Sequence, residues 1–223
     1  MSEGGATLVV VRAGVVVVAL AIWYGTQRLI AQRAATAAES GGREHPADPV
    51  LAWTAGWNAW LRAHARATDR LLVASSAMID ALGLWLIGTS VLGPTFRPFL
   101  ALLMVFALRQ VCQGLVTLPL PRGTIWRDPG VPSLLVTYGT SNDLFFSGHT
   151  AICVLAALEA GRVAPLWVAL AVGVVAAMQA TFVLALRAHY TVDVLAGALA
   201  AWGCDALAVR FAPAVDAWLA SVA

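Results

Sequence analysis

Long apolar segments alternate with short polar connections along the chain. Six segments are predicted to be membrane-spanning helices, at about residues 6–26, 71–93, 98–120, 146–161, 164–186 and 189–211. A helix needs about 20 mostly apolar residues to cross a bilayer, and only the fourth segment falls clearly short of that length. The pattern therefore predicts an all-α integral membrane protein, a bundle of six transmembrane helices.

The connections differ in character. Residues 27–49 are small and polar, with two adjacent glycines and a proline, and they are predicted to form a loop. Residues 122–143, rich in glycine and proline, form a second long loop that leads directly into the fourth segment. Between the first loop and the second span, tryptophans and neighbouring residues recur at helical spacing and form a stripe along one face. This spacing favours an interfacial amphipathic helix over an irregular loop, with its tryptophans at headgroup level. The stripe comprises Trp53, Trp57, Trp60, Leu61 and His64.

These elements divide into two parts of one domain. Residues 1–70 hold the first transmembrane helix, the loop and the interfacial helix, and residues 71–223 hold a five-helix membrane core. The first apolar run is interpreted as a retained span, because Glu3 precedes it where a signal peptide carries basic residues.

Composition supports the membrane assignment. The chain of 223 residues is 60% hydrophobic and 12% charged, whereas soluble domains are about a quarter charged. The net charge of +2 argues against a nucleic-acid partner. Cys112, Cys153 and Cys204 all fall within predicted spans without a C-x-x-C spacing, so we expect small buried apolar residues, with no disulfide framework, no thiolate metal site and no cofactor.

Two short motifs carry the candidate chemistry. Ser147-Gly148-His149 opens the fourth segment, where free backbone N–H groups and the helix dipole favour an anion. His189 and Asp193 open the sixth segment and are four residues apart, so they share one helix face. A carboxylate in that position fixes the tautomer of the imidazole and stabilises its cationic form. Together the motifs predict a phosphate site with a histidine on either side.

Other polar residues surround the motifs. Arg109 and Asp80 lie at similar depths within their spans, so each is expected either to pair with the other or to face the site. Four aromatic residues and one carboxylate lie near the motifs: Trp126, Tyr138, Asp143, Phe145 and Tyr190. Aromatic rings with a carboxylate suit an ammonium headgroup, although anchoring at the membrane interface explains such rings equally well.

Over roughly residues 100–207 the chain resembles the type 2 phosphatidic acid phosphatase superfamily. Leu118-Pro119-Leu120-Pro121, Leu144 to Thr150 and Ala188 to Asp193 are similar to motifs of the sphingomyelin synthases, and at least as similar to those of the plant phosphatidylcholine:diacylglycerol cholinephosphotransferases. The phosphatases carry an arginine six positions before the second histidine, where this chain has Val183, and a lysine in their first motif, whereas this chain has no lysine. These departures favour the transferase branch.

The resemblance implies a headgroup phosphotransferase that moves phosphocholine or phosphoethanolamine from a phospholipid to diacylglycerol or a ceramide-like alcohol. In that scheme His189 is the nucleophile, Asp193 orients it, and His149 is the general acid and later the base. Ser147 and the amides of Gly148 and His149 cradle the phosphate oxygens. An arginine at the position of Arg109 is also found in sphingomyelin-synthase-like proteins, and Asp80, Asp143 and Tyr190 complete the expected substrate-binding set.

Four alternatives stay open at this stage. A lipid phosphate phosphatase would use the same first step with water as the acceptor. A serine hydrolase would use Ser147, but no G-x-S-x-G motif is present. A zinc enzyme would use His149, His189 and Asp193 as ligands. A channel or scaffold would leave the histidines without an explanation.

Two indications about the side of the membrane on which the site lies are opposite. Nine arginines flank the spans on the motif-bearing face against three on the other, Arg97, Arg162 and Arg210, and this excess favours a cytoplasmic site. The resemblance implies the outer or luminal face instead.

Overall fold

A computed structural model describes residues 3–38, 46–116, 118–136, 138 and 145–223 of the chain. The described residues form helices connected by turns and loops, without a strand among them. In chain order the helices are α1 (Glu3–Ala38), α2 (Pro49–Trp53), α3 (Ala55–Ala63), α4 (Ala65–Leu92), α5 (Arg97–Leu115), α6 (Gly148–Val163), α7 (Leu166–Ala185) and α8 (Thr191–Ser221). The all-α expectation is therefore confirmed.

Five of the described helices, α1, α4, α5, α7 and α8, are long and apolar enough to cross a membrane. This composition fits an integral membrane protein. The expected fourth span corresponds to α6, which has only 16 residues and carries Glu159 and Arg162 near its end. Because a straight crossing needs about 20 apolar residues, α6 is too short to count as a sixth span.

Three boundaries differ from the prediction. The expected loop at residues 27–49 is helical as far as Ala38, since residues 31–38 are mostly alanine with glutamine and arginine, which favour helix. The single helix expected across the tryptophan stripe is two helices that meet at Thr54. The third span ends at Leu115, before the prolines that were expected to terminate it.

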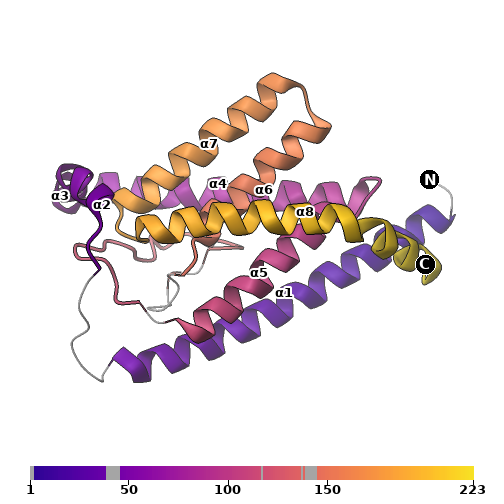
Figure 1. Ribbon diagram of the computed structural model, residues 1–223, viewed down its shortest axis with the longest axis horizontal. Helices are drawn as coiled ribbons and strands as arrows, with labels where there is room; N and C mark the ends of the chain where they lie inside the picture. The colour runs from indigo at the N-terminus through magenta and orange to yellow at the C-terminus, as the bar shows by residue number, and fades with distance from the viewer. Residues whose placement is uncertain (1–2, 39–45, 117, 137, 139–144) are drawn as a thin grey trace.

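Helix α8 runs through the middle of the bundle (Figure 1). It packs against α5, α6 and α1. The α6–α7 hairpin packs on one side of it, and α5 and α1 lie on the other. Small residues on the buried face of α8, Gly197, Ala201 and Ala208, allow its neighbours to approach closely. Within a membrane such close van der Waals packing is a main source of helix association.

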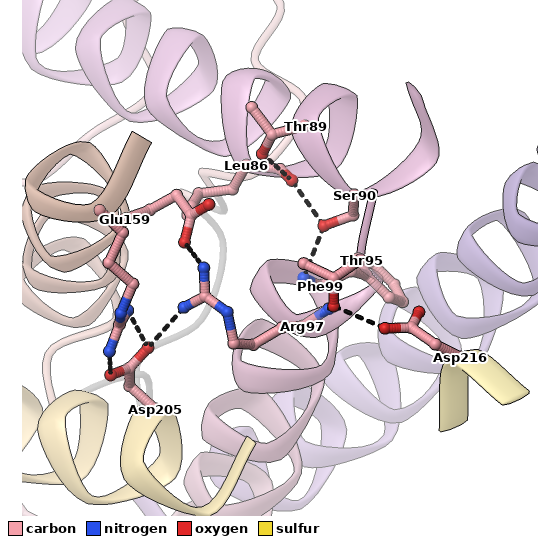
Figure 2. A network of polar contacts seen from close by, with 10 residues as sticks. Leu86, Thr89, Ser90, Thr95, Arg97, Phe99, Glu159, Asp205 and Asp216 are labelled. Carbon is pink, nitrogen blue, oxygen red and sulfur yellow. Dashed lines mark hydrogen bonds and ion pairs between the residues drawn. The ribbon is translucent and has the colours of Figure 1, made fainter. Parts of the chain in front are cut away.

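A cluster of charged side chains, which we call the buried ion cluster, joins α5, α6 and α8 (Figure 2). Arg97 contacts Glu159 at 2.5 Å and Asp205 at 3.6 Å. Arg162 donates two hydrogen bonds to the same Asp205 carboxylate, at 2.5 and 2.8 Å. Glu159 and Asp205 are buried, so each carboxylate depends on its arginine partners for charge compensation.

A second polar junction ties the end of α8 to α1 and to the turn between α4 and α5. Asp216 accepts a hydrogen bond from Thr95 Oγ1 at 2.6 Å (Figure 2). It also accepts the Phe96 amide at 2.8 Å. Arg12 of α1 completes the junction, with Nη2 lying 3.0 Å from Asp216 and Nη1 donating to the Gly93 carbonyl at 2.7 Å. Arg12 is therefore buried against α8, where the first helix is anchored.

Candidate functional site

The two sequence motifs meet where α6 and α8 begin. The rings of His149 and His189 have centroids 6.2 Å apart and are inclined by 64°. At that separation both imidazoles can reach a single phosphate group bound beside them. His189 is buried and His149 is partly exposed, so the more accessible ring is that of His149.

Asp193 fixes the orientation of the second motif. Its Oδ2 lies 3.6 Å from His189 Nδ1, within ion-pair range, and accepts the Tyr190 amide at 2.8 Å. The backbone of Asp193 also holds the other motif, because its carbonyl accepts the Ser147 amide at 2.9 Å. Since Nδ1 of His189 faces the carboxylate, Nε2 is the nitrogen available for chemistry at phosphorus.

The start of α6 is held close to both α5 and α8. Ser147 caps the helix, its Oγ accepting the Thr150 amide at 3.3 Å. Arg109 Nε donates to the Phe146 carbonyl at 2.7 Å, which places its guanidinium beside Gly148. A side chain at Gly148 would lie 3.2 Å from Arg109 Nε. Glycine at this position therefore lets the arginine reach the first turn of α6, where amide N–H groups lack intrahelical acceptors.

Gly197 provides the close approach on the α8 side. A Cβ atom at this position would lie 2.5 Å from the Ser147 carbonyl oxygen, well inside van der Waals contact. The backbone before His149 therefore rests directly on α8, so the separation of the two histidines depends on the absence of a side chain at Gly197.

Replacing Gly197 with alanine is expected to lower activity about 100-fold, because pushing the start of α6 away by about 1 Å misplaces His149. Overpacking should also lower the free energy of unfolding by about 1–3 kcal/mol. Gly203→Ala is the matched control on α8, because its Cβ would meet no described heavy atom within 4 Å. Initial rates and thermal unfolding of both variants test this; equal activity of the two would contradict it.

The described part of the loop between α5 and α6 contacts the site at His149. Trp126 lies edge-on to His149, with centroids 5.1 Å apart, and packs against Tyr138 at 4.9 Å. The loop also contacts the α7–α8 turn, where the Ile125 amide donates to the Leu186 carbonyl at 3.1 Å and Thr124 Oγ1 donates to the Arg187 carbonyl at 2.9 Å. These bonds hold an aromatic wall beside His149.

Asp80 anchors the same loop from α4. Its carboxylate accepts hydrogen bonds at 2.9 Å from Ser133 Oγ and from the amides of Leu134 and Leu135. The carboxylate thereby satisfies the backbone of a turn. The structure thus places Asp80 as a support of this loop, whereas Arg109 lies at the start of α6.

The remaining expected residues fall in three places. Asp143 lies outside the described residues. Phe145 lies two residues before Ser147, the α6 cap, and contacts Phe146 edge to face. Tyr190 is buried and lines a separate cavity at the α7–α8 turn. Burial raises the pKa of its phenol, with the nearby Asp193 charge acting in the same direction.

Two residues that the sequence reasoning passed over hold this region together. Asp48 caps α2 and also binds the start of α8, accepting the Thr191 amide at 2.7 Å and the Thr191 hydroxyl at 2.9 Å. Burial alone would raise the pKa of Asp48, but these bonds and those from the α2 amides outweigh it and lower the pKa. Arg187 lies at the α7–α8 turn with φ of 56°, and its Nη2 donates to the Leu51 carbonyl.

Small apolar cavities lie behind the histidine pair. One of about 20 Å³ is bounded by Arg109, Gly148 and His149 on one side and by apolar residues on the other. A second, of about 30 Å³, lies between α1 and α5. The two share the lining residues Trp23, Phe106 and Leu135. The two cavities are therefore neighbours on the side of His149 that faces α1 and α5.

Comparisons with known proteins find a family match that spans most of the chain. The family model described as AtPDCT1/2 matches residues 48–210, which is most of the chain and includes both histidine motifs. A relative, phosphatidylcholine:diacylglycerol cholinephosphotransferase 1 of Arabidopsis thaliana, is 30% identical over 115 residues, covering 52% of this chain and 37% of the relative. This chain therefore aligns with less than half of the relative's length. No solved structure matches the chain.

The family match begins at Asp48, the cap that joins α2 to α8, and ends at Arg210 within α8. It thus contains every described element that positions the two histidines, Asp193 and Arg109. On the extent of this match, the chain belongs to the AtPDCT1/2 family.

Proposed function

We propose that the protein transfers a phosphocholine-type headgroup from a phospholipid to diacylglycerol. The observation that carries this proposal is the pair of imidazoles, His149 and His189, facing each other across 6.2 Å with Asp193 behind the second ring. The family match and the similarity to a cholinephosphotransferase support the headgroup and the acceptor. A ceramide-like alcohol is an alternative acceptor for the same chemistry.

In the proposed first step, His189 Nε2 attacks phosphorus and the bond from phosphorus to the diacylglycerol oxygen breaks. His149 donates a proton to the departing alkoxide, so diacylglycerol leaves as the neutral alcohol. Asp193 stabilises the positive charge that develops on His189. The product is a phosphohistidine ester that still carries the headgroup alcohol.

The second step reverses the first. His149, now neutral, removes the proton from the hydroxyl of an incoming diacylglycerol, whose oxygen attacks phosphorus and displaces His189. Arg109 and the first amides of α6 lie where they can bind the phosphate oxygens in both steps. Trp126 and Tyr138 offer aromatic faces for a quaternary ammonium group.

The decisive test uses phosphatidylcholine labelled in its choline group and a diacylglycerol with distinguishable acyl chains. We expect label in the new phosphatidylcholine only when that diacylglycerol is present, and no transfer with His189→Ala. Mass spectrometry of the lipids provides the readout. Soluble labelled phosphocholine, released at the same rate with and without diacylglycerol, would instead support a phosphatase-type reaction with water as the acceptor.

A further inference from the structure

A cavity of about 200 Å³ opens at the α7–α8 turn, beside α2 and α3. Among the described residues its lining holds neither His149 nor His189, so it is separate from the space between the two imidazoles. It is lined by Pro46, Asp48, Leu51, Ala52, Ala55, Arg122, Arg187 and Tyr190. Two arginines and a phenol in one cavity suggest an anion as its occupant.

Arg187 is the central cation of this cavity. The residue is only 6% exposed, and of its guanidinium nitrogens Nη2 donates to the Leu51 carbonyl. Its Nε and Nη1 are buried without a hydrogen-bond partner in the described chain. Burial lowers the pKa of this guanidinium, although the charge of Asp48 opposes the shift. Buried donors are nearly always satisfied in folded proteins, so two open positions on one buried cation call for an acceptor from outside the chain.

The neighbouring groups favour the same occupant. The Tyr190 hydroxyl is also buried without a hydrogen-bond partner among the described residues. Arg122 lines the cavity and adds a second positive charge. Asp48, the one carboxylate among the described residues of the lining, already accepts four hydrogen bonds, from Val50, Leu51 and Thr191. The cavity thus offers open donors and a net positive charge, which match the oxygens of a phosphate.

A second cavity, mainly apolar, lies beside the first. It has a volume of about 250 Å³ and shares Pro46, Asp48 and Tyr190 with the first. Its other walls include Leu118 and Val192, and Val192 is exposed on the outer surface of α8. A ligand that fills both cavities would have a phosphate at one end and an apolar body at the other.

We propose that Arg187, Arg122 and Tyr190 form a second phosphate-binding site, which holds the headgroup of a phospholipid while the lipid's glycerol and acyl portion lies along Leu118 and Val192. The site is distinct from the histidine pair and does not require the proposed transfer reaction. Arg187 donates to a phosphate oxygen through one of its open nitrogens, Nε or Nη1, and Tyr190 donates a second hydrogen bond.

The test is the thermal unfolding midpoint of the purified full chain, titrated with dihexanoyl phosphatidic acid or dihexanoyl phosphatidylcholine. Parallel arms use inorganic phosphate and dihexanoylglycerol at the same concentrations. We expect a saturable rise in the midpoint with the phospholipids alone. Arg187→Gln and Tyr190→Phe should each weaken the apparent affinity about tenfold or more, because each removes hydrogen bonds to a charged group.

Two controls separate this site from the proposed reaction. The double variant His149→Ala/His189→Ala should retain the phospholipid-dependent rise although it transfers no headgroup. Arg66→Gln, which removes an exposed arginine outside the cavity, should also retain it. If Arg187→Gln does not fold, Tyr190→Phe and Arg122→Gln decide the question, since one removes a single oxygen and the other alters an exposed side chain.

Three results would overturn the proposal. One is a phospholipid response that persists unchanged in Arg187→Gln and Tyr190→Phe. Another is a response that disappears in the double histidine variant, which would assign the binding to the histidine pair. The third is an equal response to inorganic phosphate, which would identify free phosphate, and not a lipid headgroup, as the ligand.

Discussion

His189→Ala is expected to reduce headgroup transfer by about 10⁴-fold or more, because it removes the only nucleophile in the proposed mechanism. The same variant should fail to form a covalent intermediate. Rapid quenching of the wild-type enzyme with headgroup-labelled phospholipid should give acid-labile label on the peptide that contains His189. Adding diacylglycerol should remove that label by transferring it to new phospholipid.

Three further variants distinguish the roles within the site. His149→Ala should retain slow reaction with a nitrophenyl ester donor, since that leaving group needs little protonation. Asp193→Asn should slow the first step while leaving lipid binding largely intact. His64→Ala is the matched control, because His64 is exposed and stacks on Trp60 at 4.5 Å. Acid-labile label that persists in His189→Ala would rule out the assigned nucleophile.

Hydropathy alone predicted most of the helices because membrane spans leave a strong one-dimensional signal. The predicted span at 164–186 corresponds to α7 (Leu166–Ala185), and that at 71–93 corresponds to the greater part of α4. Boundaries were missed where a helix continues beyond its apolar stretch. Helix α4 begins earlier, at Ala65, and α8 continues past Pro213 to Ser221, because polar helix formers and a tolerated proline extend a helix without adding hydropathy.

The proximity of the two histidine motifs was also predictable, because both begin helices on the same side of the predicted bundle. The sequence could not reveal how that proximity is maintained. The contact of Gly197 with the Ser147 carbonyl joins residues 50 positions apart, and nothing local marks that glycine among the others in the chain. Similarly, the depth of Asp80 was correctly noted, but its three bonds to residues 133–135 depend on the path of a loop.

Arg187 illustrates a different limit. In sequence it is one of several arginines near helix ends, where exposure and phosphate or headgroup contact are the ordinary expectation. Its burial results from the packing of α2 against the α7–α8 turn, which Asp48 maintains through Thr191. A long-range contact between residues 48 and 191 has no signature in hydropathy, so the cavity that Arg187 lines could be found only in the structure.

Arg97→Met is expected to lower the free energy of unfolding by about 3–5 kcal/mol, because it leaves Glu159 as an uncompensated buried carboxylate. Arg97 is the described partner of Glu159, at 2.5 Å, whereas Asp205 retains its two hydrogen bonds from Arg162 (Figure 2). The measurement is denaturant or thermal unfolding of the purified protein in detergent. Protein that remains folded should keep most of the proposed transfer activity, since Glu159 lies about 15 Å along α6 from His149.

The double variant Arg97→Met/Glu159→Gln provides the internal test. A buried neutral amide costs far less free energy than a buried carboxylate without a cation beside it. We therefore expect the double variant to recover at least half of the stability lost in Arg97→Met. Arg210→Met is the control for removing an arginine from an exposed position on α8, and it should change stability by less than about 0.5 kcal/mol. Equal losses in Arg97→Met and the double variant would show that the stranded carboxylate is not the cause. In that case the packing of the Arg97 side chain, and not its charge, would hold α5 against α6 and α8.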